Sequence, residues 1–96
     1  MRVDIRRLSD RAAVERAIHD CLSEGVDTFL ERRGFGASKR YPLIWDGHEL
    51  PSKAIAAAAY GKQFSTEGPI TREQLSGGGH VVDVLRALGF EVRERP

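Results

Sequence analysis

The sequence predicts an α+β fold, in which about four short helices pack on a small antiparallel sheet made of a β-hairpin and a third strand. Three observations predict this fold. An apolar stripe with helical spacing runs over residues 13–22, an Asp-Gly pair separates two strand-like runs within residues 41–50, and small residues fill a helical segment at 53–60. Helices are therefore expected both before and after a hairpin in the sequence.

Length and composition predict one domain. The chain has 96 residues, of which 41% are hydrophobic and 30% charged, and its formal net charge is +1. These values exclude collagen-like, coiled-coil and disordered chains. We predict a single domain over residues 1–96, with a core at about 10–93 and a tail or the start of a linker at 94–96. A lone cysteine suits a reducing cytoplasm, and no apolar run is long enough to span a membrane.

Two helices are expected first. The first begins after Ser9 or Asp10, which can serve as its N-cap, and ends at Gly25. Its apolar stripe consists of Ala13, Val14, Ala17, Ile18, Cys21 and Leu22. The second helix covers residues 26–33, and Gly34 followed by Phe35 predicts a Schellman motif at its end.

The hairpin follows from its turn. Asp46-Gly47 is typical of a two-residue type I′ turn. Such a turn pairs Trp45 with His48 and Leu43 with Leu50, all on one face. Pro42 places its strand at the edge of the sheet or at a position without a ladder hydrogen bond.

Two more helices and a strand complete the chain. The third helix is predicted at 53–60, capped by Ser52 and stopped by Gly61, and its small residues indicate that it lies at the centre of the domain. The last helix is predicted at 81–88 and ends in Gly89-Phe90 in the same way as the second. Residues 91–93 are expected to form a third strand against the hairpin.

Five cations are candidates for contacts to phosphate. Arg32, Arg33, Lys39 and Arg40 lie within nine residues. Arg32 and Arg33 also complement the dipole of the helix that they end, which would explain them without a ligand, whereas Lys39 and Arg40 lie in a loop. Lys53 opens the third helix, where a cation opposes the dipole, so either a carboxylate pairs with it or it is held for an anionic ligand.

A glycine run before the last helix could bind an anion. Gly77, Gly78 and Gly79 place backbone N–H groups at the positive end of the helix dipole, and Ser76 and His80 can also donate to an oxyanion. A tight loop that lets the helix pack closely would explain the same glycines.

Catalytic motifs are absent from the sequence. His19, His48 and His80 lie on three different predicted elements, without the spacing of a zinc site. Cys21 belongs to an apolar stripe, where a small core residue is expected. We predict no catalytic residue, no metal and no cofactor.

The order of the motifs FLERRGFG, YPLIWDGHELPSKAI and LSGGGHVVDVLRALGFEV, within about residues 12–93, resembles a known family. It is similar to the N-terminal head domain of McrA-like type IV, modification-dependent restriction endonucleases. The resemblance implies an accessory domain that helps to bind DNA or to assemble the enzyme, in front of domains that read modified DNA and a C-terminal HNH nuclease. It points to Lys53, Lys39–Arg40 and Gly77–Gly79. The nuclease motif is absent here, so cleavage does not carry over.

These observations predict a non-catalytic DNA-binding or accessory domain that contacts the phosphate backbone of a plain or modified duplex. The predicted contact residues are Arg32, Arg33, Lys39, Arg40, Lys53, Ser76, Gly77, Gly78, Gly79 and His80. The alternative is a protein-interaction or dimerisation head that positions neighbouring domains, which the near-neutral charge favours. Expected partners are DNA, downstream domains of the same polypeptide and a second copy of the chain, but no membrane.

Overall fold

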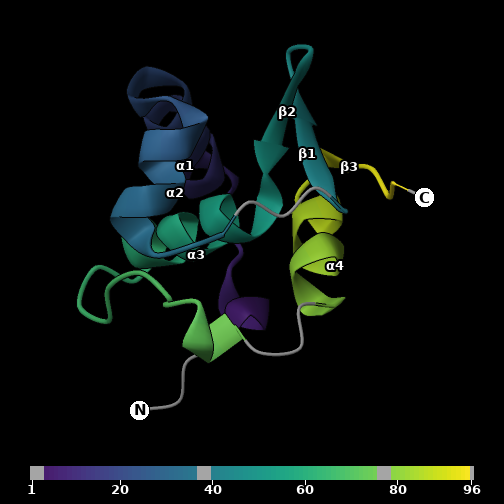
Figure 1. The fold of residues 1–96 in the computed structure, drawn as a ribbon. Coiled ribbons are helices and arrows are strands. Elements are labelled where there is room, and N and C mark those ends of the chain that lie inside the picture. Colours follow the sequence, from purple (N-terminus) through teal and green to yellow (C-terminus); the bar gives the residue numbers. More distant parts are fainter. Residues whose placement is uncertain (1–3, 37–39, 76–78, 96) are drawn as a thin grey trace.

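The computed structural model describes residues 4–36, 40–75 and 79–95, and it confirms the predicted α+β fold (Figure 1). The first half contains α1 (Arg11–Glu24), α2 (Val26–Arg33), β1 (Pro42–Trp45) and β2 (His48–Pro51). The second half contains α3 (Ser52–Gln63), α4 (Gly79–Ala87) and β3 (Glu91–Val92). Two short 3-10 helices, η1 (Ile5–Arg7) and η2 (Glu73–Leu75), precede α1 and α4.

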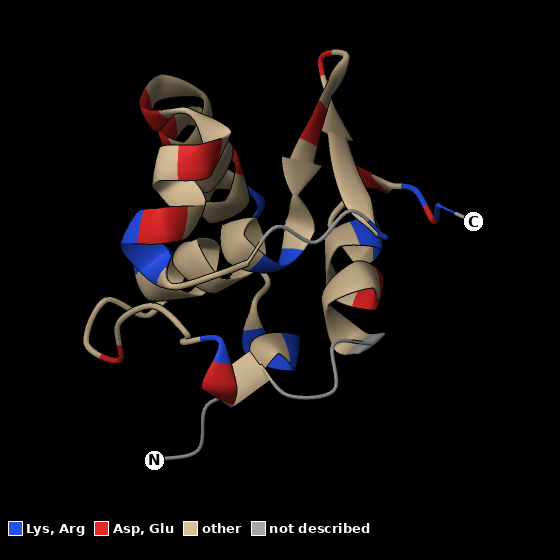
Figure 2. Cartoon of the chain, in the orientation of Figure 1, with Lys and Arg blue, Asp and Glu red and all other residues tan. Residues whose placement is uncertain are grey.

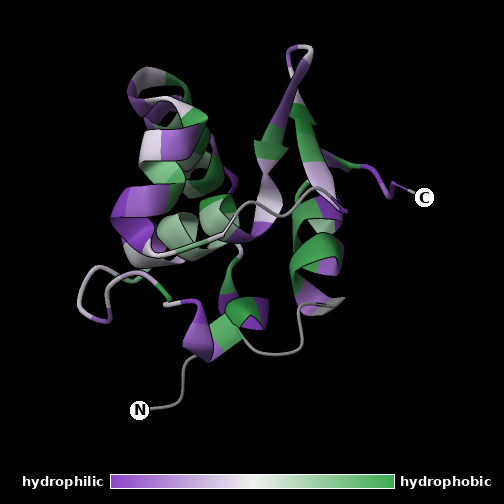
Figure 3. Cartoon of the chain, in the orientation of Figure 1, coloured by the Kyte–Doolittle hydropathy of each residue, from purple (hydrophilic) through white to green (hydrophobic). Residues whose placement is uncertain are grey.

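The centre of the core is α3, as its composition predicts. Every residue from Ala54 to Tyr60 is buried. Most of these side chains are methyl groups, so α1 and α4 can both pack closely against this helix. Figure 3 shows hydrophobic residues along α3, α4 and the strands. The helix thereby joins the two halves of the chain.

The apolar stripe of α1 is confirmed at five of its six positions, which are Ala13, Val14, Ala17, Ile18 and Cys21. The prediction for Leu22 is wrong, because this side chain is 39% exposed. At roughly 100° per residue, Ala13 and Leu22 lie at the two opposite edges of the stripe, and Leu22 is the one of the two that is exposed. The buried face of α1 is therefore narrower than the apolar stripe predicted from the sequence.

The sheet has the strand order β2-β1-β3, with both pairs antiparallel, and the third strand is confirmed. The predicted hairpin register is also confirmed, including the pair Leu43–Leu50. Of the two placements predicted for Pro42, an edge strand or a position without a ladder hydrogen bond, the edge strand is wrong, because β1 is the central strand. Pro42 is tolerated there as the first residue of β1, where its carbonyl accepts a hydrogen bond of 3.0 Å from the N–H of Arg93.

The ends of α3 differ from the prediction. Ser52 is the first helical residue and not the cap, because its hydroxyl donates to the carbonyl of Tyr41 at 2.6 Å. Gly61 does not stop the helix, which continues to Gln63. A Cβ at Gly61 would lie 2.5 Å from the nitrogen of Pro69, so this glycine permits the loop after α3 to approach the helix.

The ends of α2 and α4 confirm the predicted Schellman motifs. The N–H of Phe35 donates to the carbonyl of Leu30 and that of Phe90 to the carbonyl of Leu85, both at 3.0 Å. α4 itself begins at Gly79, two residues earlier than predicted, and ends at Ala87. A helix boundary of this kind depends on packing as well as on local signals.

The core also includes residues before the predicted start at about residue 10. Ile5 and Leu8 are buried, and η1 packs against α4. No helix in the described part of the chain is long and apolar enough to cross a membrane.

Gly61→Ala tests the close approach between α3 and its loop. We expect the free energy of unfolding to fall by about 1–3 kcal/mol, the usual cost of overpacking, although alanine favours helix more than glycine does. Urea unfolding measures the change. Gly36→Ala is the matched control, since, apart from its chain neighbours, no atom of the described residues lies within 4 Å of a Cβ there, and it should stay within about 0.5 kcal/mol. Equal stability of the two variants would contradict the close approach.

Candidate nucleic-acid interface

The residues predicted to bind nucleic acid lie at three places in the structure. Arg32 and Arg33 end α2, Arg40 and Lys53 lie where the hairpin meets α3, and Gly79 and His80 begin α4. The remaining four, Lys39, Ser76, Gly77 and Gly78, lie outside the described residues. The contacts of the described candidates differ among the three places.

The two cations at the end of α2 share one carboxylate. Arg33 donates to both oxygens of Glu24, at 3.0 and 3.3 Å, and its guanidinium lies 3.9 Å from the centroid of the Phe29 ring. Arg32 lies 3.5 Å from the same carboxylate. The side chain of Arg33 is 25% exposed and that of Arg32 is 67% exposed. Arg33 therefore ties α2 to the end of α1, and Arg32 is the more accessible of the two.

Arg40 and Lys53 lie on either side of the bond that joins the hairpin to α3. This bond links Ser52 to the carbonyl of Tyr41, and each partner is the chain neighbour of one cation. Arg40 is exposed, with its guanidinium 5.5 Å from the centroid of the Tyr41 ring, and Lys53 is half-buried. Neither forms an ion pair with any residue in 4–36, 40–75 or 79–95, so the carboxylate considered as a partner for Lys53 is not found there. Two cations without a described counter-ion are thus held at one end of the sheet.

The C-terminal segment lies beside the end of the sheet that holds Arg40 and Lys53. The N–H of Arg95 donates to the carbonyl of Arg40 at 2.8 Å, so antiparallel pairing continues past the end of β3. The guanidinium of Arg95 forms an ion pair with Glu49 of β2. Local sequence gives no signal for this arrangement, because two charged residues followed by a proline are typical of a loop. Arg95 is therefore a neighbour of the site that sequence reasoning misses.

The start of α4 lies away from the sheet. Arg86, in the last turn of this helix, donates to the carbonyl of Val92 at 2.7 Å and so places that end of α4 beside β3. The first and last residues of the helix are roughly 12 Å apart at 1.5 Å per residue. At the first end, exposed His80 lies near Asp4, whose pKa is lowered to about 2, chiefly by side-chain hydrogen bonds from Arg6. Gly79 and Arg40 thus lie toward opposite ends of α4.

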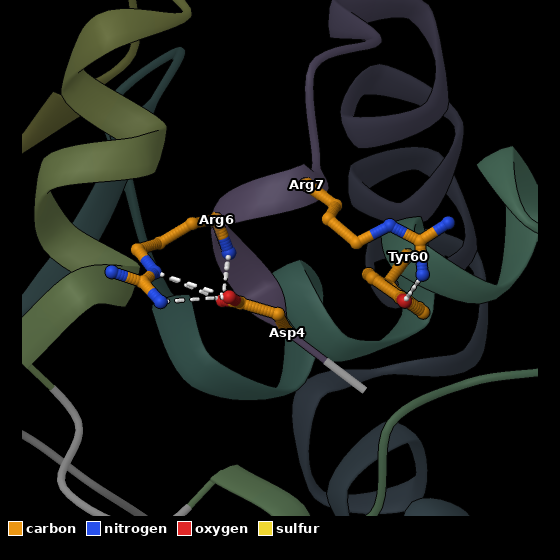
Figure 4. A network of polar contacts seen from close by, with 4 residues as sticks. All are labelled: Asp4, Arg6, Arg7 and Tyr60. Carbon is orange, nitrogen blue, oxygen red and sulfur yellow. Dashed lines mark hydrogen bonds and ion pairs between the residues drawn. The ribbon is translucent and has the colours of Figure 1, made fainter. Parts of the chain in front are cut away.

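A polar cluster that sequence reasoning misses fixes η1 against α3 (Figure 4). Arg7 donates to the hydroxyl of Tyr60 at 2.9 Å and to Glu67 at 3.1 Å, and the Tyr60 hydroxyl donates to the same oxygen of Glu67 at 2.8 Å. The guanidinium of Arg7 also lies 4.3 Å from the centroid of the Phe64 ring. Burial raises the pKa of Tyr60. Every bond in the cluster joins parts of the fold, so its role is structural.

The described residues offer little for catalysis. Within them, no group of three or more His, Cys, Asp or Glu side chains could hold a metal ion. Cys21 is buried, and burial raises the pKa of its thiol, which makes it a poor nucleophile.

Charge is distributed unevenly along the sheet. Figure 2 shows acidic residues toward the tip of the hairpin, where Asp46 and Glu49 lie, and basic residues at the start of α3 and on η1. Arg40, Lys53 and Arg95 lie toward the end of the sheet away from the turn. The two ends of the sheet therefore differ in their balance of charge.

A family model covers nearly the whole chain. The model, described as the ScoMcrA-like N-terminal head domain, matches residues 7–94. The chain belongs to this family. The resemblance seen in the order of sequence motifs is thereby confirmed, and the paired Leu-Gly-Phe and Arg-Gly-Phe helix ends lie within the matched range.

The head domain is also similar to part of a solved structure, that of the Type IV phosphorothioation-dependent restriction endonuclease ScoMcrA. The two sequences are 28% identical, and the TM-score is 0.68. The match covers 93% of this chain and 13% of the other, so the head domain spans a small part of that protein's length. No curated protein matches the chain.

The Glu24–Arg33 pair makes the stability of the head domain depend on pH. Hydrogen bonds from Arg33 lower the pKa of Glu24 below its ordinary value of 4.5, so the pair stabilises the fold above that pH and the effect is lost as the pH falls through the lowered value. We expect Glu24→Gln to lower the melting temperature at pH 7, by an amount that shrinks toward about pH 3. Thermal unfolding at several pH values measures this.

Glu31→Gln is the matched control for that measurement. Glu31 is an exposed carboxylate on α2 that forms no ion pair with the described residues, so its removal should change the melting temperature less. An effect of Glu24→Gln that is equal at all pH values would contradict the stabilising pair.

Proposed function

We propose that the head domain is a non-catalytic DNA-binding domain of a modification-dependent restriction endonuclease and that it contacts the phosphate backbone. The observation that carries this proposal is the pair Arg40 and Lys53, which lie at one end of the sheet without a described counter-ion. A cation without a carboxylate partner keeps its charge available for a phosphate. Membership of a family named after a restriction endonuclease supports the same conclusion.

The other predicted residues extend the proposed contact. Lys39 precedes Arg40 in the chain and is expected to add a third cation beside it. Ser76, Gly77–Gly79 and His80 would offer donors to a second phosphate at the start of α4. Arg32 is accessible enough to contribute, whereas Arg33 contributes least because Glu24 and Phe29 hold it.

Contacts of this kind position a duplex without reading its sequence. With a net charge of +1, the attraction depends on a few local cations, and the dissociation constant is expected at roughly 10⁻⁴–10⁻⁶ M at physiological salt. We infer that recognition of the modification and cleavage belong to other domains of the same cytoplasmic polypeptide. The head domain would assist them by adding non-specific affinity for DNA.

A protein-interaction or dimerisation head is the second candidate function. The near-neutral charge favours it, since dedicated DNA-binding domains usually carry a basic excess. An apolar docking patch would favour it further, but among the described residues Leu22 is the large hydrophobic side chain that is exposed. DNA binding therefore accounts better for the surface that the structure describes.

Arg40→Gln and Lys53→Gln test the proposed contact. Each variant is expected to weaken binding several-fold, equally for duplexes of different sequence, and to lower the slope of log affinity against log salt by about 1. Fluorescence anisotropy of a labelled duplex, at about 50 and about 200 mM salt, measures both quantities.

Arg16→Gln is the control for these variants. Arg16 is exposed on α1, forms no ion pair with the described residues, and carries the same charge. Its removal should leave the salt slope unchanged. If the unchanged protein does not bind the duplex even at low salt, DNA binding is wrong and the interaction head becomes the better proposal.

A further inference from the structure

One face of the sheet is directed toward the core and the other toward solvent. A cross-strand row on the first face is buried and consists of Leu43, Leu50 and Val92. The adjacent row contains Glu49 and Glu91, which are exposed. Since successive residues of a strand point to opposite faces and paired residues share a face, these two carboxylates lie on the open face of the sheet.

The same alternation places Arg40 and Arg95 on the open face. Their backbones are joined by the hydrogen bond from the N–H of Arg95 to the carbonyl of Arg40, at 2.8 Å. Tyr41 donates to Glu94 at 3.3 Å, which is the side-chain contact expected of cross-strand partners on the opposite face. Arg40 and Arg95 are therefore adjacent in one row, at the end of the sheet where α3 begins and Lys53 lies in its first turn.

The side chain of Arg95 crosses the open face. Its guanidinium pairs with Glu49, which belongs to β2, and β1 lies between β2 and the C-terminal segment. Pro42 of β1, on the same face, is buried, as expected if a long side chain passes over it. The pair itself is open to water, with Arg95 40% and Glu49 48% exposed. An ion pair so exposed contributes little to stability and is readily broken.

We propose that Glu49 occupies the place of a DNA phosphate, and that Arg95 exchanges this carboxylate for a phosphate when a duplex binds. The inference rests on the proposed function and deepens it. A carboxylate and a phosphate accept the same hydrogen bonds from a guanidinium, so the exchange requires only a change in the side chain of Arg95. In the free domain Glu49 neutralises Arg95, and in the complex Arg95 becomes a further contact beside Arg40 and Lys53. Glu49 thereby holds the affinity for DNA below what the arginines alone would give.

Glu49→Gln tests the exchange, because it removes the competing charge with little change in shape. Binding is expected to tighten about two- to fivefold at fixed salt, as measured by anisotropy of a labelled duplex. Arg95→Gln is expected to weaken binding and to lower the salt slope by about 1. In the double variant the gain from Glu49→Gln should vanish, since Glu49 acts through Arg95.

Asp46→Asn is the matched control. It removes one negative charge from the same hairpin, at a turn residue with a φ of 49°, which asparagine adopts readily. A gain as large as that of Glu49→Gln would show a general effect of charge and would overturn the exchange, as would a gain that persists without Arg95. A melting curve for each variant corrects the affinities for the folded fraction.

The outcomes separate this inference from the proposed function. If the unchanged protein does not bind the duplex at low salt, the proposed DNA binding and the exchange at Arg95 are both wrong. If it binds, and Arg40→Gln weakens binding while Glu49→Gln changes nothing, the phosphate contact stands and the exchange alone is wrong.

Discussion

Residues 54–60 of α3 are enclosed by the rest of the chain, and the small side chains of its alanines let neighbouring elements approach this helix closely. α1 packs along it, α4 contacts it, and the loop after it approaches the backbone at Gly61. Each of these contacts depends on the absence of bulk on α3. The two larger residues of the segment, Ile55 and Tyr60, are themselves fully buried, so the helix tolerates size only where the fold provides a place for it.

The position of α3 also determines where the candidate site lies. Its first residue, Ser52, is bonded to Tyr41, and this bond places Lys53 beside the start of β1 and hence beside Arg40. The backbones of both cations are thus fixed by the core and the sheet, so little ordering of the main chain is needed when a ligand binds. A domain with a net charge of +1 can contact a polyanion in this way, because the arrangement of a few charges matters more than their sum.

Features with local signals could be predicted from the sequence. The turn at Asp46-Gly47 specified the hairpin register, and glycine followed by phenylalanine specified the ends of α2 and α4. Features that depend on distant partners could not. Gly61 is equally typical of a helix stop and of a close backbone contact, and only the position of Pro69 decides between them. The central place of β1 depends on β3, which is too short to indicate by itself where it pairs.

The residues of the candidate site likewise differ in whether local sequence or tertiary contacts determine them. Composition and spacing indicate the cations near residue 40 and Lys53 as candidates. The sequence does not show which arginines are already neutralised by a carboxylate. Glu24 reaches Arg33 from another helix, and Glu49 reaches Arg95 from the far side of the sheet. Such pairings are tertiary contacts, and they decide how much of the basic charge a ligand can use. Arg95 could not be predicted as part of the site for this reason, because the sequence around a charged residue near the end of a strand does not indicate which residue it contacts.

The chain has a single tryptophan, Trp45, which is half-buried on the face of the sheet directed toward the core, with its ring centroid 5.9 Å from that of Phe90. The arginines proposed to meet phosphate lie on the other face. The thickness of the sheet therefore separates the indole from a bound duplex, while unfolding would expose the same indole to water. Its emission spectrum should accordingly follow the integrity of the sheet and respond weakly to DNA, so that one optical signal reports folding and leaves binding to be read separately.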